Sequence, residues 1–147
     1  MKTKPSTLLK EIQASARAVD WAWFQHLQGE LPEEAFLDLL LNYQTPEGGF
    51  GSGLEPDCLN PNPSPIQTWW ALHYLMQTKV AYTHPMHLKI YRYLKETMQH
   101  APLFFTTQPS NNDYPHAVWW HYDEKTASWG YNPSIALWAY MVKAHGD

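Results

Sequence analysis

The chain has 147 residues, a formal net charge of −4 at pH 7 and a pI near 6.0. That length suits one domain with a single core, and the acidic balance argues against nucleic acid or an anionic membrane as a partner. The chain has one cysteine, no stretch of about 18 apolar residues and no N-terminal apolar segment typical of a signal peptide, so we expect a cytoplasmic protein without disulfides or membrane spans.

Two kinds of helix are predicted to alternate along the first part of the chain. A helix from about residue 6 to residue 28 is amphipathic, with one buried stripe formed by Leu9, Ile12, Ala16, Val19 and Trp23. A second helix follows Pro32 and is apolar on nearly every side. A third helix, residues 64–78, is also apolar on more than one side, and a fourth, residues 84–99, is again one-sided. A helix without a polar face is normally buried all round.

The start of the third helix is well specified. Ser64 is the expected N-cap, Pro65 occupies the first helical position and Gln67 the third. This arrangement predicts a capping box, in which the Ser64 and Gln67 side chains bond each other's backbone amides.

The segment between the second and third helices carries a glycine-rich turn, residues 48–51, and two carboxylates, Glu55 and Asp57. The turn either holds an anion at the start of the third helix or is a tight connection between helical hairpins. Glu55 and Asp57 are candidates for an acid/base pair or for binding a cationic transition state. Alternatively, they cap neighbouring backbone N–H groups.

A long irregular stretch, residues 101–131, is rich in aromatic residues, and this composition argues against disorder and for a functional role. Part of it, residues 115–121, is expected to form a short helix or an extended piece. The last helix opens at Asn132, as N-cap, and Pro133, and is apolar all round. Ser64-Pro65 lines up with Asn132-Pro133, which indicates an internal repeat.

These patterns predict an all-α protein built from helical hairpins stacked side by side. One-sided helices would form an outer layer and apolar helices an inner layer. No strand-like alternation of any length is present.

Gln44, Gly48 and Phe50 form the pattern Gln-x-x-x-Gly-x-Phe. This pattern resembles the Gln-x-x-x-Gly-x-Trp repeat of squalene and oxidosqualene cyclases, with Phe in place of Trp. The wider sequence, GGFG followed by LEPD, looks like a group of bacterial proteins related to terpenoid cyclases and protein prenyltransferases. The resemblance covers Leu31 to Leu75, and Tyr131 to Ala144 more loosely. It implies an α/α toroid, in which inner and outer helices alternate around a central cavity.

The sequence departs from these families at their catalytic motifs. It has no Asp-x-Asp-Asp motif of the squalene-type cyclases, and Asp57 and Cys58 are adjacent, so the Asp-x-Cys zinc spacing of the prenyltransferases is lost. His84 and His87 have no third ligand in the sequence and are expected at the surface. No metal or cofactor is therefore predicted.

Three functions remain open, and the sequence does not decide whether the protein is an enzyme. The leading hypothesis is a terpenoid-cyclase-like protein with an aromatic-lined cavity for an apolar ligand or a cationic intermediate. Its acid would be Asp57 or Glu55, and its ligand-binding residues Trp69, Trp70, His73, Trp119, Trp120 and Trp129. The alternatives are a carbohydrate-active hydrolase or lyase that uses the same two carboxylates, and a non-catalytic scaffold in which the aromatic residues form the core.

Five helices are too few to close a ring of about five to seven hairpins. We therefore expect residues 1–147 to form a single domain with an incomplete α/α toroid. This domain would associate with a second copy of itself or be the front part of a longer protein. In a homo-oligomer, the last helix would lie in the interface, because its apolar face would otherwise be exposed.

Overall fold

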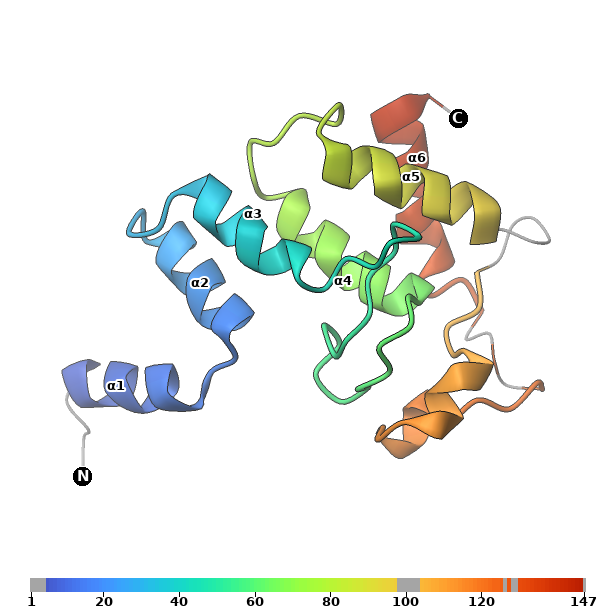
Figure 1. Cartoon of the computed structure of the whole chain (residues 1–147), viewed down its shortest axis with the longest axis horizontal. Coiled ribbons are helices and arrows are strands. Elements are labelled where there is room, and N and C mark those ends of the chain that lie inside the picture. Colours follow the sequence, from blue (N-terminus) through green and yellow to red (C-terminus); the bar gives the residue numbers. More distant parts are fainter. Residues whose placement is uncertain (1–4, 98–103, 126, 128–129, 147) are drawn as a thin grey trace. The chain divides into compact units, whose positions relative to one another are not determined.

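The computed structural model describes residues 5–97, 104–125, 127 and 130–146, and in these residues the protein is all-α, as predicted (Figure 1). Its elements are α1 (Pro5–Ser15), α2 (Ala18–Leu27), α3 (Glu33–Leu41), α4 (Pro65–Leu75), α5 (Pro85–Thr97), the 3-10 helices η1 (Pro109–Asp113) and η2 (Val118–Trp120), and α6 (Ser134–His145). Within the described ranges the only β-pairing consists of isolated bridges. The chain divides into two compact units, Met1–Leu41 and Asn42–Asp147.

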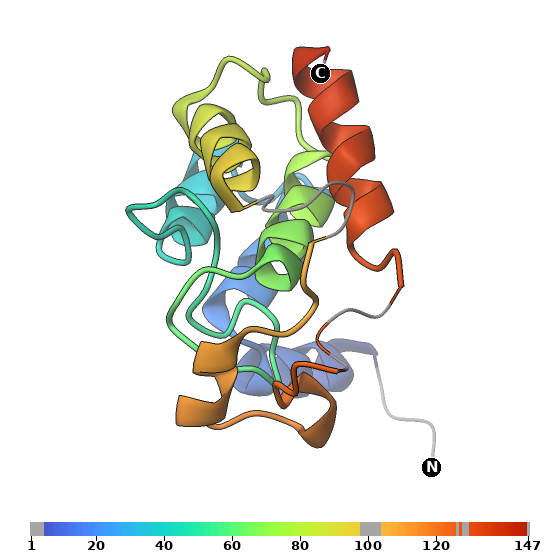
Figure 2. The same cartoon turned by 90° about the vertical axis from the view of Figure 1, so that its right-hand side faces the viewer.

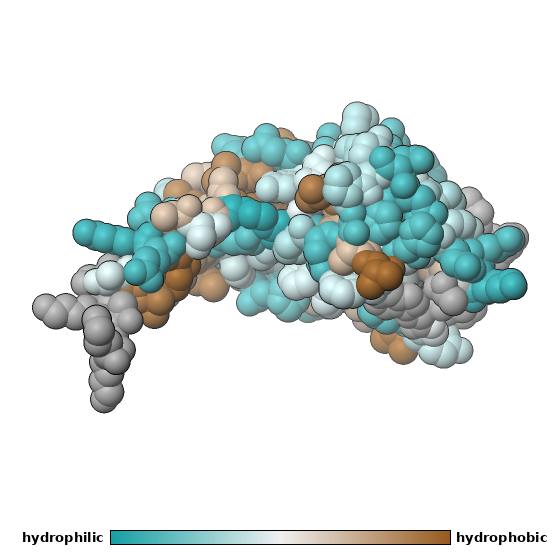
Figure 3. Space-filling model, turned by 90° about the horizontal axis from the view of Figure 1, so that it is seen from below, coloured by the Kyte–Doolittle hydropathy of each residue, from teal (hydrophilic) through white to brown (hydrophobic). Residues whose placement is uncertain are grey.

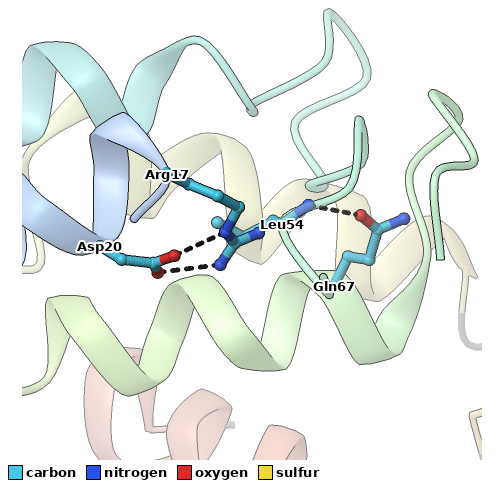
Figure 4. A network of polar contacts seen from close by, with 4 residues as sticks. All are labelled: Arg17, Asp20, Leu54 and Gln67. Atoms are coloured by element: carbon cyan, nitrogen blue, oxygen red, sulfur yellow. Dashed lines mark hydrogen bonds and ion pairs between the residues drawn. The ribbon is translucent and has the colours of Figure 1, made fainter. Parts of the chain in front are cut away.

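In the first unit, the long helix expected over residues 6–28 is two helices. Arg17 separates them in an extended conformation, with ψ at 152°. Its guanidinium donates two hydrogen bonds, of 2.6 and 2.9 Å, to the Asp20 carboxylate in the first turn of α2 (Figure 4). This pair fixes Asp20 at the positive end of the α2 dipole, which favours a new helix start over continuation of α1. The stripe of α1 is exposed at Leu9 and Ile12, against expectation.

Helices α2 and α3 form the first helical hairpin. Gly29 makes the turn after α2 with a φ of 73°, a conformation that glycine adopts readily. Trp23 packs on Phe36, with ring centroids 4.9 Å apart, and Phe36 and Leu40 are fully buried. One face of the second predicted helix is therefore buried, whereas Leu41 at its end is 46% exposed, so burial on every side is not observed.

In the second unit, α4 lies between α5 and α6 (Figure 2). Its N-cap is Ser64, whose hydroxyl accepts from the Gln67 amide at 3.3 Å, and Pro65 occupies the first turn, as predicted. The reciprocal half of the capping box is absent, because the Ser64 amide donates to the carbonyl oxygen of Phe50. The Gln67 side chain is thereby available to the connection between α3 and α4, residues 42–64, which we call the glycine-rich loop. Most of α4 is buried, and His73 and Met76 at its end are exposed.

Helices α5 and α6 meet through a cluster of histidine and tyrosine rings, of which His87 and Tyr140 are buried. His87 stacks on Tyr140 with centroids 5.7 Å apart, and Tyr91 lies 3.9 Å from the His145 ring. The expectation that His87 lies at the surface is wrong: its Nδ1 is 3.0 Å from the Tyr140 hydroxyl. Burial, helped by the charges of neighbouring histidines, lowers the pKa of His87 to about 4.

Helix α6 differs from its predicted form in two respects. It begins at Ser134, because Pro133 occupies the N-cap position and the Ser134 hydroxyl accepts the Phe104 amide at 2.8 Å. It also buries one face only: Leu137, Tyr140 and Met141 are buried, whereas Ile135 and Val142 are 65% and 56% exposed. The outward face of α6 is therefore apolar and open.

In the aromatic stretch, residues 115–117 are hydrogen-bonded to the glycine-rich loop. The Leu59 amide donates to the Pro115 carbonyl at 3.0 Å, and the Ala117 amide donates to the Asp57 carbonyl at 2.8 Å. Residues 115–117 are thus extended and pass into η2, so both forms expected for 115–121 occur.

Exposed large apolar side chains occur in both units, among them Leu27, Val118, Trp119 and Ile135. Figure 3 shows one face of the molecule by hydropathy, with separate apolar patches among polar residues. None of the described helices has the length and hydropathy needed to cross a membrane.

Candidate functional site

The glycine-rich loop after α3 is held by hydrogen bonds from its amides to its own carbonyl oxygens and to side chains of α4. The side-chain oxygen Oε1 of Gln67 accepts from the amide of Gly53 at 3.1 Å and from the amide of Leu54 at 3.0 Å, the second bond being drawn in Figure 4. The amides of Gly48, Phe50, Gly51 and Ser52 also donate within the protein. Because these N–H groups already have acceptors, their bonding favours the tight structural turn over an anion cradle.

The Gln-x-x-x-Gly-x-Phe pattern joins this loop to α5. The Gln44 side chain donates to the carbonyl oxygens of Gly48 and Met86, at 2.9 and 3.1 Å. A Cβ on Gly48 would lie 2.3 Å from the Lys89 carbonyl oxygen, so only glycine permits this approach. Phe50 is fully buried. The motif that carries the family resemblance is therefore architectural here.

The two candidate acids are each paired with a tryptophan. The indole N–H of Trp70 donates to Oε2 of Glu55, and the indole N–H of Trp120 donates to Oδ1 of Asp57 at 2.6 Å. Glu55 is buried and Asp57 is partly exposed. The carboxylates and indoles hold each other in fixed orientations.

Asp57 lines a shallow groove where the glycine-rich loop meets residues 115–117. This Asp57 groove has a volume of about 310 Å³, and its walls are Pro56, Asp57, Leu59, Pro115, His116 and Ala117. The groove contains one carboxylate and one imidazole from different segments of the chain.

A second pocket lies between α4 and α6. This α4–α6 pocket has a volume of about 290 Å³ and is lined by Trp69, Leu72, His73, Met76, Ala136 and Ala139. Trp69 meets Trp70 edge-on, with centroids 5.3 Å apart, and lies 5.9 Å from the His73 ring. Apart from the imidazole, the lining side chains are apolar.

The predicted site residues do not form one site: they lie in the α4–α6 pocket, in the Asp57 groove and in the two carboxylate–indole pairs. Trp69 and His73 line the α4–α6 pocket, and Asp57 lines the groove. Trp70 and Trp120 hold the carboxylates, and Trp120 is 6% exposed. Trp119 is 54% exposed and lines neither pocket. The remaining predicted residue, Trp129, lies outside the described residues.

Sequence reasoning missed a buried polar network that leads to Asp57. The Asn60 side chain donates to Asn111 at 2.8 Å, and Asn111 donates to the Trp120 carbonyl at 2.9 Å. Trp120 in turn donates to Asp57. Asparagines in loops usually signal turns, so their spacing gave no indication of this contact.

Cys58 is fully buried beside these residues. Burial raises the pKa of its thiol, and the charges of Glu55 and Asp57 act in the same direction. Since the thiolate is the reactive form, Cys58 is a poor nucleophile. Among the described residues, no group of three or more His, Cys, Asp or Glu side chains is placed to hold a metal ion.

In comparisons with known proteins, the chain matches no family model, no curated protein and no solved structure.

Proposed function

We propose that the protein binds a small apolar or cationic organic ligand in the α4–α6 pocket, as part of an incomplete α/α toroid similar to those of terpenoid cyclases. The observation that carries this proposal is the composition of the pocket wall. A tryptophan and an imidazole project from α4, whereas α6 contributes only Ala136 and Ala139. Small side chains on one helix leave room beside the aromatic face of the other.

The aromatic wall is held in place by a chain of contacts. Glu55 accepts the indole N–H of Trp70, and Trp70 meets Trp69 edge-on. A carboxylate that accepts an indole N–H fixes the ring and increases its π-electron density. The ring that lines the pocket is Trp69, and an aromatic ring held in place favours a cation by about 0.5–2 kcal/mol.

The size and lining of the pocket define the ligand class. A volume of about 290 Å³ is at the lower end for small-molecule sites, which suits a short isoprenoid or a compact quaternary ammonium compound. No carboxylate lines this pocket. Binding there would depend on burial of apolar surface and on the Trp69 ring.

The carbohydrate-active alternative has less support. Glycosidase chemistry requires two carboxyl groups that face one cavity. The Asp57 groove is lined by one carboxylate, and the Glu55 carboxyl group is buried against Trp70. We therefore assign the leading function to the α4–α6 pocket and propose no reaction there.

A thermal-shift screen tests this assignment with three ligands: benzyltrimethylammonium, geraniol and maltotriose. We expect benzyltrimethylammonium or geraniol to raise the Tm of the wild-type protein, and maltotriose to leave it unchanged. Trp69→Ala should abolish the shift. The matched control is Trp119→Ala, which removes an exposed tryptophan that lines neither pocket. A shift by maltotriose alone, or a shift that Trp69→Ala retains, would contradict the proposal.

A further inference from the structure

His116, which lines the Asp57 groove, and His121 face each other through their ring nitrogens. Nε2 of His116 and Nδ1 of His121 are 3.2 Å apart, and the rings are within 22° of parallel. Nδ1 of His116 lies 2.6 Å from the carbonyl oxygen of Tyr114. Because a carbonyl only accepts, neutral His116 carries its proton on Nδ1, and its Nε2 lone pair is directed towards His121.

This separation is close to that of two ligands on one metal ion. Zinc binds histidine nitrogens at about 2.0–2.1 Å, and tetrahedral geometry then places two such nitrogens about 3.4 Å apart. Metal-binding histidines usually donate their second ring N–H to a carbonyl or carboxylate, as His116 does to Tyr114. We propose that His116 and His121 form a two-histidine site for a divalent transition-metal ion such as Zn²⁺.

The backbone around His116 is fixed by the glycine-rich loop. On one side of His116, the Pro115 carbonyl accepts from the Leu59 amide. On its other side, the Ala117 amide donates to the Asp57 carbonyl. His116 therefore has little freedom to move away from His121.

The backbone around His121 is fixed from η1. The Trp120 carbonyl accepts from the Asn111 side chain at 2.9 Å. The Asn112 side chain bonds both backbone groups of Tyr122, at 3.1 and 2.8 Å. Both histidines are thus held before any ion arrives, which reduces the conformational cost of binding.

His116 and Asp57 line the same groove, and the described residues provide no third metal-ligand group. Water or a groove-bound molecule would therefore complete the coordination, as in zinc sites that keep an open position. This inference is independent of the proposed α4–α6 ligand.

Isothermal titration with Zn²⁺ alone tests the site on the full chain. We expect one saturable site in the wild-type protein, weakened about tenfold or more by His116→Ala and by His121→Asn. His121 is exposed, so its replacement leaves the core intact. The matched control is His84→Asn, in which Asn can replace the His84 Nδ1 atom as acceptor for the Met86 amide. The control should bind Zn²⁺ as the wild type does.

A second readout needs no variant. Electron paramagnetic resonance of the wild-type protein with one equivalent of Cu²⁺ should show hyperfine coupling to two imidazole nitrogens, and to one in His121→Asn. Absence of saturable Zn²⁺ binding would overturn the proposal. So would binding that survives both substitutions, an equal loss in His84→Asn, or coupling to fewer than two imidazoles in the wild type.

Discussion

Replacement of Gln67 by alanine should be among the most destabilising polar substitutions in the chain. Gln67 is fully buried on α4, and its side-chain amide group makes three hydrogen bonds. Its oxygen accepts from Gly53 and Leu54, and its nitrogen donates to the Asn60 carbonyl at 3.2 Å. At a net value of about 1 kcal/mol for each bond, their loss costs about 3 kcal/mol. The cavity left behind brings the expected loss to about 3–4 kcal/mol.

Urea denaturation followed by tryptophan fluorescence measures this loss. The matched control is Gln77→Ala, which removes an exposed glutamine side chain that donates to the His73 carbonyl. The control should change the free energy of unfolding by no more than about 0.5 kcal/mol. If Gln67→Ala costs less than about 1 kcal/mol, the glycine-rich loop does not depend on α4 in the way described.

Three further predictions concern the carboxylate–indole pair, the buried histidine and the open helix face. Trp70→Phe removes the N–H that Glu55 accepts and should cost about 1–3 kcal/mol in urea denaturation; an unchanged midpoint would mean that the pair has no structural role. The pKa of His87 is lowered in the folded state, so folding favours its neutral form. The free energy of unfolding should therefore show no loss from His87 above pH 6.5 and should fall by up to about 3 kcal/mol as the pH drops towards 4. His87→Phe should remove most of this dependence, and an identical pH profile for the variant would contradict the assignment. The exposed apolar residues Ile135 and Val142 of α6 should promote self-association, so light scattering should find a dimer that Ile135→Glu converts to monomer; a wild-type monomer at micromolar concentration would refute this.

Local signals predicted the parts of the fold that depend on local interactions. Ser64 and Pro65 place the start of α4 correctly, because capping and the fixed φ of proline act within one helical turn. The glycines predicted the tight loop for the same reason. The division between α1 and α2 was missed, because apolar periodicity continues past residue 17 and only the Arg17–Asp20 pair marks the new start.

The exposure of α6 depends on contacts that the sequence does not specify. Its residues are apolar on every side, and composition alone therefore predicted burial all round. The structure covers only the face with Leu137 and Tyr140. Which face is covered depends on α4 and α5, so periodicity in α6 contains no information about it.

The candidate site was predicted by residue type but not by arrangement. Glu55, Asp57 and the tryptophans were selected because acids and aromatic rings suit ligand binding. Their pairing, Trp70 with Glu55 and Trp120 with Asp57, joins residues 15 and 63 positions apart. Such pairs depend on tertiary packing and leave no periodic signal.

The central claim is that a ligand binds between α4 and α6. Chemical-shift mapping in ¹H–¹⁵N correlation spectra tests it most directly, because each tryptophan indole and each backbone amide reports separately. Titration with whichever of benzyltrimethylammonium and geraniol raises the Tm should shift the Trp69 indole signal and the amides of His73, Ala136 and Ala139. Amides of residues 115–117 in the Asp57 groove should stay unchanged. Shifts confined to the groove, or no saturable shifts at all, would contradict the account.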